Sequence, residues 1–174
     1  AEVQRISRET LLCDVIWETL DGTEILISTT RPELICACGV VMVHPDDERY
    51  KELRGKRVKL PLPVTGRPES VEIQTHPSVK ADFGSGVLMV CSFGDQNDVS
   101  VFRELGLKPF QAIDLEGKMT EVSGPLHGLN VLDARKLAIS ILEDSGKLSS
   151  KENRLQDIPV SERGSIPVGL IVLK

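Results

Sequence analysis

The chain has 174 residues, 40% of them hydrophobic and 27% charged, which fits one folded domain with a buried core and excludes wholesale disorder. Its net charge of −5 excludes a broadly basic surface for long phosphate backbones, although it is compatible with a pocket that grips one nucleotide end. Aromatic residues make up only 3%, which argues against a platform that stacks one ring on each base of a long single strand.

The first quarter of the chain predicts a β-hairpin, a turn and a buried strand. Asp21-Gly22 is typical of a two-residue hairpin turn. Pro32 interrupts the strand pattern, because it has no N–H to donate and forces Arg31 towards an extended conformation. The strands predicted here from alternating or continuous apolar runs are residues 11–19, 24–28 and 35–43.

The middle of the chain predicts two helices between short strands. Pro45 in the first helical position, acidic residues after it and Gly55 near the stop predict a short helix over residues 46–53. A second helix is expected over residues 96–105, ended by Gly106. The strands predicted in this part are residues 57–60, 70–75 and 86–92.

The C-terminal third contains the clearest helix. Residues 134–145 place apolar side chains at i, i+3, i+4, i+7 and i+8, with Asp133 as the cap and Gly146 beyond the end. Further short strands are predicted at residues 110–115, 118–122, 158–161 and 166–173. Many short strands with a few helices predict a β-rich α+β domain, with a closed or nearly closed β-barrel core decorated by α-helices.

The sequence gives no sign of a membrane or metal partner. No apolar run approaches the roughly 20 residues of a membrane helix, and a signal peptide is absent, so we expect a cytoplasmic protein. The four cysteines lack zinc-ligand spacing and are expected to be free thiols, without a metal site. Because the chain starts at Ala1 within a strand-like pattern, we expect residues 1–174 to be a single domain excised from a larger protein.

The most informative polar segment is Gly94-Asp95-Gln96-Asn97-Asp98, at the predicted start of a helix. Asp95 and Asp98 suit an N-cap and its partner three residues later. Alternatively, one carboxylate faces a pocket and receives an ammonium or hydroxyl group, and the two roles can coexist. Nothing in the chain forms a credible Ser/His/Asp or Cys/His set, so no side-chain nucleophile is predicted.

Three other polar segments have simpler explanations. The hydroxyls of Thr29 and Thr30 are expected to bond to local backbone in a turn. The acidic run at residues 46–48 is expected to be a solvated helix face. In residues 83–86 (FGSG), the third glycine of a dinucleotide fingerprint is missing, so the glycines are expected to allow a tight entry into a buried strand.

Together these segments resemble the editing domain inserted into the class I aminoacyl-tRNA synthetases for valine, isoleucine and leucine. The resemblance extends over nearly the whole chain in the family's order, and the acidic run is most similar to the valyl branch. Pro32-Glu33-Leu34 resembles the archaeal valyl form. The matching segments are residues 29–33 (TTRPE), 44–50 (HPDDERY), 83–86 continuing through 94–98, and Gly128-Leu129 to Ala134-Arg135.

The resemblance implies proofreading hydrolysis of mischarged Thr-tRNA(Val). The family's two ATP-binding signatures are absent, so no aminoacylation is expected; editing needs no cofactor, and ATP and Mg²⁺ belong to the parent synthetase. The implied partners are the aminoacylated 3′ end of tRNA(Val) and the remainder of the synthetase chain. The alternatives are editing for an isoleucyl or leucyl enzyme, or a non-catalytic insert that binds the tRNA acceptor end.

The resemblance also implies roles for individual residues. Asp98 aligns with the acid that holds the α-ammonium of the substrate, and Asp95 with a residue that recognises the threonine hydroxyl. Two departures matter: Met89 stands where bacterial valyl relatives can present lysine, and Cys91 replaces a threonine, so Cys91 is expected only as a pocket wall. The other implied substrate-binding residues, near the terminal adenosine, are Thr29, Thr30, Arg31 and Phe83.

Overall fold

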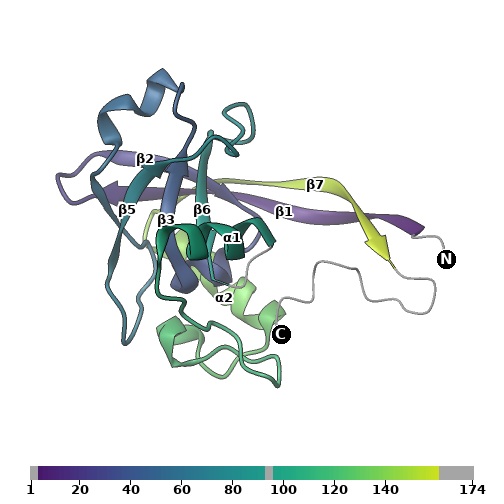
Figure 1. The fold of residues 1–174 in the computed structure, drawn as a ribbon. Helices are drawn as coiled ribbons and strands as arrows, with labels where there is room; N and C mark the ends of the chain where they lie inside the picture. Colours follow the sequence, from purple (N-terminus) through teal and green to yellow (C-terminus); the bar gives the residue numbers. More distant parts are fainter. Residues whose placement is uncertain (1–3, 93–95, 161–174) are drawn as a thin grey trace.

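The computed structural model describes residues 4–92 and 96–160 (Figure 1). The strands of this part are β1 (Gln4–Thr19), β2 (Glu24–Thr29), β3 (Cys38–Val43), β4 (Arg57–Lys59), β5 (Ser70–Thr75), β6 (Val87–Cys91) and β7 (Leu148–Val160). The α-helices are α1 (Gln96–Leu105) and α2 (Val131–Asp144), and the short 3₁₀ helices are η1 (Pro32–Ala37), η2 (Glu48–Leu53) and η3 (Glu121–Leu126).

All seven strands belong to one sheet, in the order β2-β1-β4-β5-β3-β6, with β7 paired to β1. Every pairing is antiparallel except that of β3 with β5. The long strand β1 pairs with β7 through its first part and with β2 and β4 through its last part. Figure 1 shows the β1–β7 ribbon extending away from the rest of the molecule.

The sheet curls into a nearly closed barrel. Its two ends, β2 and β6, pack side by side, but no backbone ladder joins them within the described residues. We call this line of contact the seam. The predicted fold class, a β-rich α+β domain with a barrel core and few helices, is confirmed.

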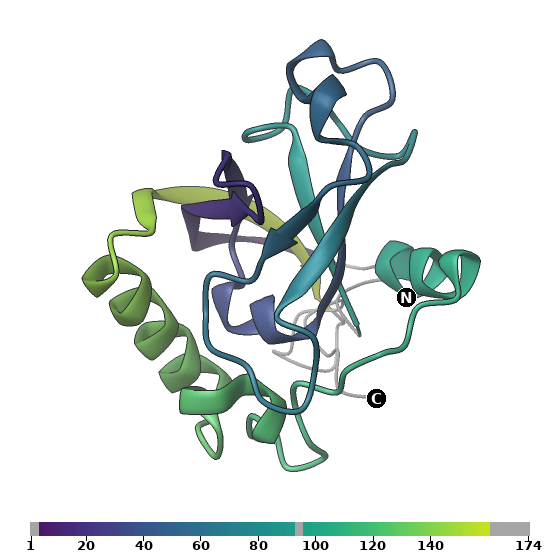
Figure 2. The ribbon, with the colours of Figure 1, turned by 90° about the vertical axis from the view of Figure 1, so that its left-hand side faces the viewer.

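Two apolar clusters lie on opposite faces of β3. Val41 and Val43 belong to the main core, which α2 covers, whereas Val40 and Met42 belong to a second cluster with Phe102 of α1. Figure 2 shows α1 and α2 on opposite sides of the sheet. A Cβ on Gly39 of β3 would overlap the Phe102 ring, so the close approach of α1 requires glycine at this position.

The run of residues 35–43 is only partly a strand. Its first three residues belong to η1, and β3 starts at Cys38. Pro32 stands in the first turn of η1, where its missing N–H costs nothing, and all six residues of η1 are buried. A continuous apolar run fits a buried helix as well as a buried strand, so periodicity alone did not separate them.

Several helix and turn boundaries also differ from prediction. Helix α2 begins three residues early, because Asn130 is the N-cap and its side chain accepts the N–H of Asp133 at 2.9 Å. The helix after Pro45 is the 3₁₀ helix η2, capped by Asp47. The first hairpin loop has three residues between Thr19 and Thr23, whose backbones pair (N···O 2.8 Å).

The C-terminal third differs most. The segments predicted as strands at residues 110–115 and 118–122 make only isolated bridges, followed by η3. β7 starts at Leu148, ten residues before the strand predicted at 158–161, whose first three residues form the end of β7. The turn and the second strand of the predicted final hairpin lie beyond residue 160, outside the described residues. The strands predicted at 24–28, 57–60, 70–75 and 86–92 and the helix at 96–105 are confirmed within a residue or two. No described helix has both the length and the apolar character needed to cross a membrane.

Candidate active site

A cavity of about 240 Å³ opens at the seam of the barrel. Its walls come from the end of β2 and the following turn, from the loop that precedes β6, and from β6 itself. Helix α1 contributes Val101, three residues beyond Asp98. Because the two edge strands meet here without pairing, the seam leaves room for a ligand between them.

The structure brings together five of the seven residues predicted to bind substrate: Thr29, Thr30, Arg31, Phe83 and Cys91 all line the cavity. Asp95 lies outside the described residues. Asp98 lies in the first turn of α1, but its side chain is not among those described. The proposed roles of the two carboxylates therefore stay predictions.

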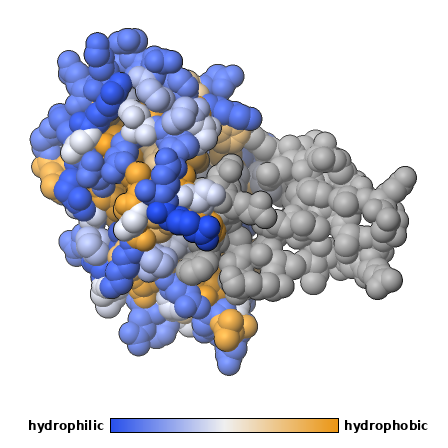
Figure 3. Space-filling view, viewed as in Figure 1, coloured by the Kyte–Doolittle hydropathy of each residue, from blue (hydrophilic) through white to orange (hydrophobic). Residues whose placement is uncertain are grey.

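The cavity mouth is apolar and exposed. Phe83 keeps 54% of its surface accessible and Leu88 38%, and both line the cavity. Most of the described surface seen in Figure 3 is hydrophilic, with smaller apolar areas between. An exposed aromatic ring and an arginine that line one cavity suit a ligand that has both a flat ring and polar or anionic groups.

The turn at residues 29–31 has the local hydrogen bond expected from its sequence. The Thr29 hydroxyl accepts the backbone N–H of Arg31 at 3.0 Å. Before it, the buried Ser28 hydroxyl donates to Asp14 of β1 at 2.5 Å, and Asp14 also accepts from Ser150 of β7 at 2.7 Å. These bonds tie the cavity end of β2 to the neighbouring strands.

Behind this turn, η1 is fixed by two arginines. Arg135 of α2 donates to both carboxylate oxygens of the fully buried Glu33, at 2.9 and 2.8 Å, and this pairing raises the pKa of Arg135. Arg67 donates to the carbonyls of Cys36 and Cys38, at 2.9 and 2.6 Å. The first contact joins two of the segments that carry the family resemblance, residues 29–33 and 128–135.

The cysteines are free and buried, as predicted. Cys91 lines the cavity and stands opposite Cys38 in the β3–β6 register, and Met89 lines the same wall. Burial raises the pKa of the Cys36 thiol to about 12 and also raises that of Cys13. These environments favour uncharged thiols that serve as packing groups.

Sequence reasoning missed the rest of the lining, which includes Ser28, Ser78 and Leu88. Ser28 and Leu88 lie in predicted strands, where alternation gives no sign that a strand borders an opening. Ser78 belongs to a short loop with no motif of its own. Their role depends on which strands form the two ends of the sheet, which is a property of topology.

The fold has clear relatives among solved structures. The CP1 domain of a leucyl-tRNA synthetase (GlLeuRS-CP1) superimposes with a TM-score of 0.62 at 10% identity, over 81% of this chain and 99% of that one. The Agrobacterium radiobacter K84 leucyl-tRNA synthetase, solved with tRNA and LeuAMS, gives 0.62 at 21% identity, over 93% of this chain and 24% of that one. In fold, the chain therefore matches the CP1 editing domain of the class I aminoacyl-tRNA synthetases.

Within that class, the sequence belongs with the archaeal valine–tRNA ligases. It is 45% identical over 87% of its length to the enzyme of Aeropyrum pernix and 38% over 99% to that of Methanopyrus kandleri. The match to the Methanothermobacter thermautotrophicus enzyme is 39% over the whole chain. The chain spans about a fifth of the length of these relatives (18–20%). No protein-family model matches the sequence.

Proposed function

We propose that this chain hydrolyses threonine from mischarged Thr-tRNA(Val). The observation that carries the proposal is the cavity at the seam, where Thr29, Thr30, Arg31, Phe83 and Cys91 meet from separate segments. The similarity to valine–tRNA ligases supports the choice of amino acid. The partners on this proposal are the aminoacylated end of tRNA(Val) and the rest of a synthetase, and the hydrolysis uses no cofactor.

The chemistry of valine selection explains why such a site is needed. A hydrophobic valine pocket cannot strongly reject threonine, and the established discrimination of valyl enzymes is only about 10²-fold. An editing site solves the problem by accepting only an amino acid with a side-chain hydroxyl, which threonine has and valine lacks. We assign this recognition to Asp95, because valine would leave a desolvated carboxylate unpaired, and the α-ammonium to Asp98.

The reaction proposed is attack by a positioned water. The water oxygen bonds to the ester carbonyl carbon, the bond to the ribose oxygen breaks, and the protons of the water end on the ribose hydroxyl and the released threonine. The aminoacyl ester is labile, so orientation and selection supply the main advantage. A terminal hydroxyl of the tRNA is the proposed assisting group, because His76, which bonds to the lining residue Ser78 at 2.7 Å, is not among the described residues that line the cavity.

A deacylation panel tests the proposal. The chain is assayed with Thr-tRNA(Val), with Val-tRNA(Ile) and with a mischarged tRNA(Leu), and the Asp98→Ala variant is assayed beside it. We expect Thr-tRNA(Val) to be hydrolysed fastest and Asp98→Ala to lose about 10- to 100-fold, since a charge-assisted contact contributes up to about 3 kcal/mol. Asp144→Ala, on an exposed end of α2, is the matched control and should keep full activity.

The outcomes separate the alternatives. Near-normal hydrolysis by a folded Asp98→Ala variant would contradict the assignment of Asp98. Preference for Val-tRNA(Ile) or for the leucine tRNA would indicate an isoleucyl or leucyl editing site. Binding of a threonyl-adenosine analogue without turnover of any substrate would favour a non-catalytic insert.

A further inference from the structure

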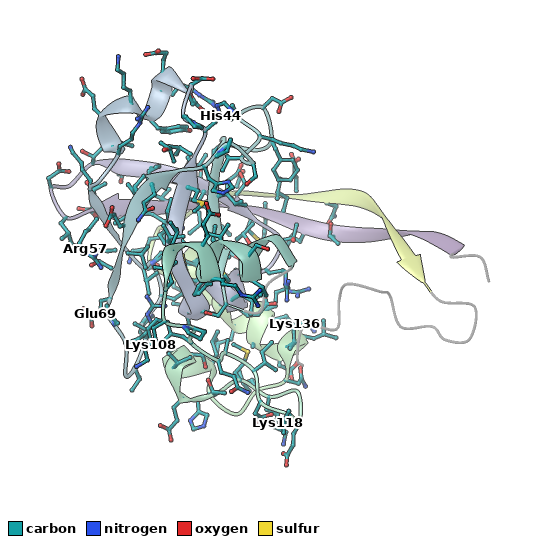
Figure 4. The ribbon with its side chains drawn as sticks, viewed as in Figure 1. His44, Arg57, Glu69, Lys108, Lys118 and Lys136 are labelled. Atoms are coloured by element: carbon teal, nitrogen blue, oxygen red, sulfur yellow. The ribbon has the colours of Figure 1, made fainter. Side chains whose placement is uncertain are left out.

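Residues 44–50 (HPDDERY) contact the loop that carries Phe83. Asp46 and Glu48 of the acidic run are exposed as predicted, whereas the side chain of Asp47 is buried. Arg49 donates from Nη2 to the carbonyl of Ala81 at 2.7 Å, and the Tyr50 hydroxyl donates to the carbonyl of Ser85. The two carbonyls lie on either side of Phe83 in the sequence. Figure 4 places His44, the start of this segment, at the end of the molecule where η2 also lies.

The Arg49 guanidinium is held in place by Asp47. Asp47 accepts its Nε at 3.0 Å and its Nη2 at 2.8 Å, and the Asp47 side chain is only 5% exposed. The guanidinium carbon also lies 5.1 Å from the centre of the Tyr50 ring. A two-point pair of this kind fixes the plane of the guanidinium, which lysine in its place would not do.

At its two glycines the loop packs closely against both neighbours. A Cβ on Gly86, whose φ is +80°, would overlap the Arg49 guanidinium and lie 2.7 Å from the carbonyl oxygen of Ala81. On the other side, a Cβ on Gly84 would lie 2.7 Å from the Ser28 hydroxyl oxygen. The loop is therefore packed between residues 47–50 and the cavity end of β2.

Phe83 separates two hollows. It lines the cavity of about 240 Å³ at the seam and also a second one of about 170 Å³, formed with Lys80 and Val87. Ser28, Ser78 and Leu88 line both as well. A shift of the Phe83 loop would change the shape of both hollows at once.

We propose that Asp47, Arg49 and Tyr50 form a loop clamp, a set of positioning residues that hold Phe83 at the cavity mouth. None of the three lines the cavity itself. The clamp thereby sets the affinity for the terminal adenosine of an aminoacylated tRNA, and this part rests on the proposed function. The clamp does not touch the reacting ester, so it affects binding and leaves the hydrolytic step unchanged.

Two conservative variants test the clamp. Tyr50→Phe keeps the ring but removes the hydroxyl that donates to Ser85, and Arg49→Lys keeps the charge but loses the two-point pair. Arg54→Lys is the matched control, because Arg54 also donates to a carbonyl near η2, that of Pro45 at 2.9 Å, outside the Phe83 loop. Each variant is studied by hydrogen–deuterium exchange, by binding of a non-hydrolysable threonyl-adenosine analogue and by deacylation kinetics.

We expect faster exchange of amides 80–87 in Tyr50→Phe and Arg49→Lys. The KM for Thr-tRNA(Val) and the Kd of the analogue should rise by about three- to tenfold, the effect of one lost hydrogen bond, while kcat stays within about twofold. Arg54→Lys should match the unmodified chain in every measurement. The KM-against-kcat split separates positioning from a general loss of structure.

Unchanged exchange, or faster exchange with unchanged analogue affinity, would overturn the clamp. A fall in kcat at constant KM would overturn it as well. If the unmodified chain deacylates no tRNA, the proposed function fails by itself, and exchange with analogue binding still decides whether the clamp holds the loop.

Discussion

At the scale of single residues, the contact between Glu33 and Arg135 has the largest expected effect on stability. Glu33 is fully buried, and its two oxygens receive two hydrogen bonds from a side chain 102 positions away. Removing a carboxylate from water is costly, and only a well-oriented partner offsets that cost. The pair therefore fixes η1, and with it the turn that lines the cavity, at a definite distance from α2.

Arg135→Met should destabilise the protein by about 3–5 kcal/mol, because it leaves the Glu33 carboxylate buried without its partner. The free energy of unfolding in urea measures this loss. Lys136→Met is the control, since Lys136 is an exposed neighbour on the same helix (Figure 4). The double variant Glu33→Met/Arg135→Met should regain part of the loss. A loss below about 1 kcal/mol for Arg135→Met would show that water reaches Glu33.

At the scale of elements, sequence patterns predicted most strands but not those whose state depends on distant partners. Residues 35–37 are apolar like a strand, yet they remain in η1, where Arg67 satisfies the carbonyl of Cys36. Residues 148–157 have little strand character, yet they pair with β1 along most of β7. Both outcomes depend on a segment far away in the chain, which a local pattern does not contain.

The first hairpin shows how a turn can depend on charge. Asp21 accepts the Lys56 ammonium at 2.7 Å and the Thr23 hydroxyl at 3.0 Å, and it also pairs with the Thr19 hydroxyl. The hydrogen bonds from Lys56 and from the threonines lower the pKa of this carboxyl well below its ordinary value. A group with a lowered folded-state pKa stabilises the fold above its unfolded pKa, near 4, and loses that contribution as the pH falls further.

Asp21→Asn should therefore lower the melting temperature at pH 6, and by less at pH 2. The gap in melting temperature between the unmodified protein and the variant should close steadily below about pH 4. The reason is that the Asp21 carboxylate becomes protonated as the pH approaches its folded-state pKa. Melting curves between pH 2 and pH 7 measure the gap. Since Asp21 is exposed, 0.5 M salt should reduce it. A gap that is constant with pH would mean that the charge of Asp21 does not stabilise the turn.

At the scale of the whole molecule, segments that are far apart in the sequence meet in pairs around one opening. Residues 29–33 contact Arg135, and residues 47–50 contact the loop of residues 81–86. The family resemblance could predict the set of segments and part of the cavity wall. It could not predict which segment supports which, because those contacts depend on the seam between β2 and β6.

The net charge of −5 also takes on a more specific meaning in this context. An acidic net charge does not favour a broad basic surface, but the seam combines Arg31 with an exposed aromatic ring in a small opening. This combination suits recognition of one terminal nucleotide. It does not suit tracking along a backbone, which requires many cationic contacts.

Thiol reactivity provides a test of the whole fold and of the cavity together. The four cysteines are each at most 3% exposed, and burial raises the pKa of Cys13 and Cys36, which suppresses their reactive thiolates. In the native state, we expect N-ethylmaleimide at pH 7.5 to modify Cys13, Cys36 and Cys38 at least about 10³-fold more slowly than in guanidinium, because the core must open first. Cys91 lines the cavity and should react earliest, and a threonyl-adenosine analogue should protect it.

Mass spectrometry of the labelled peptides assigns each site, and the Cys91→Ala variant should lack the early phase. Rapid native labelling of Cys13 or Cys36 would contradict the buried core, since neither residue lines the cavity at the seam. If the analogue does not slow the early labelling of Cys91, then the analogue does not bind in the cavity at the seam. One experiment therefore tests the buried core through Cys13, Cys36 and Cys38, and ligand binding in the cavity at the seam through Cys91.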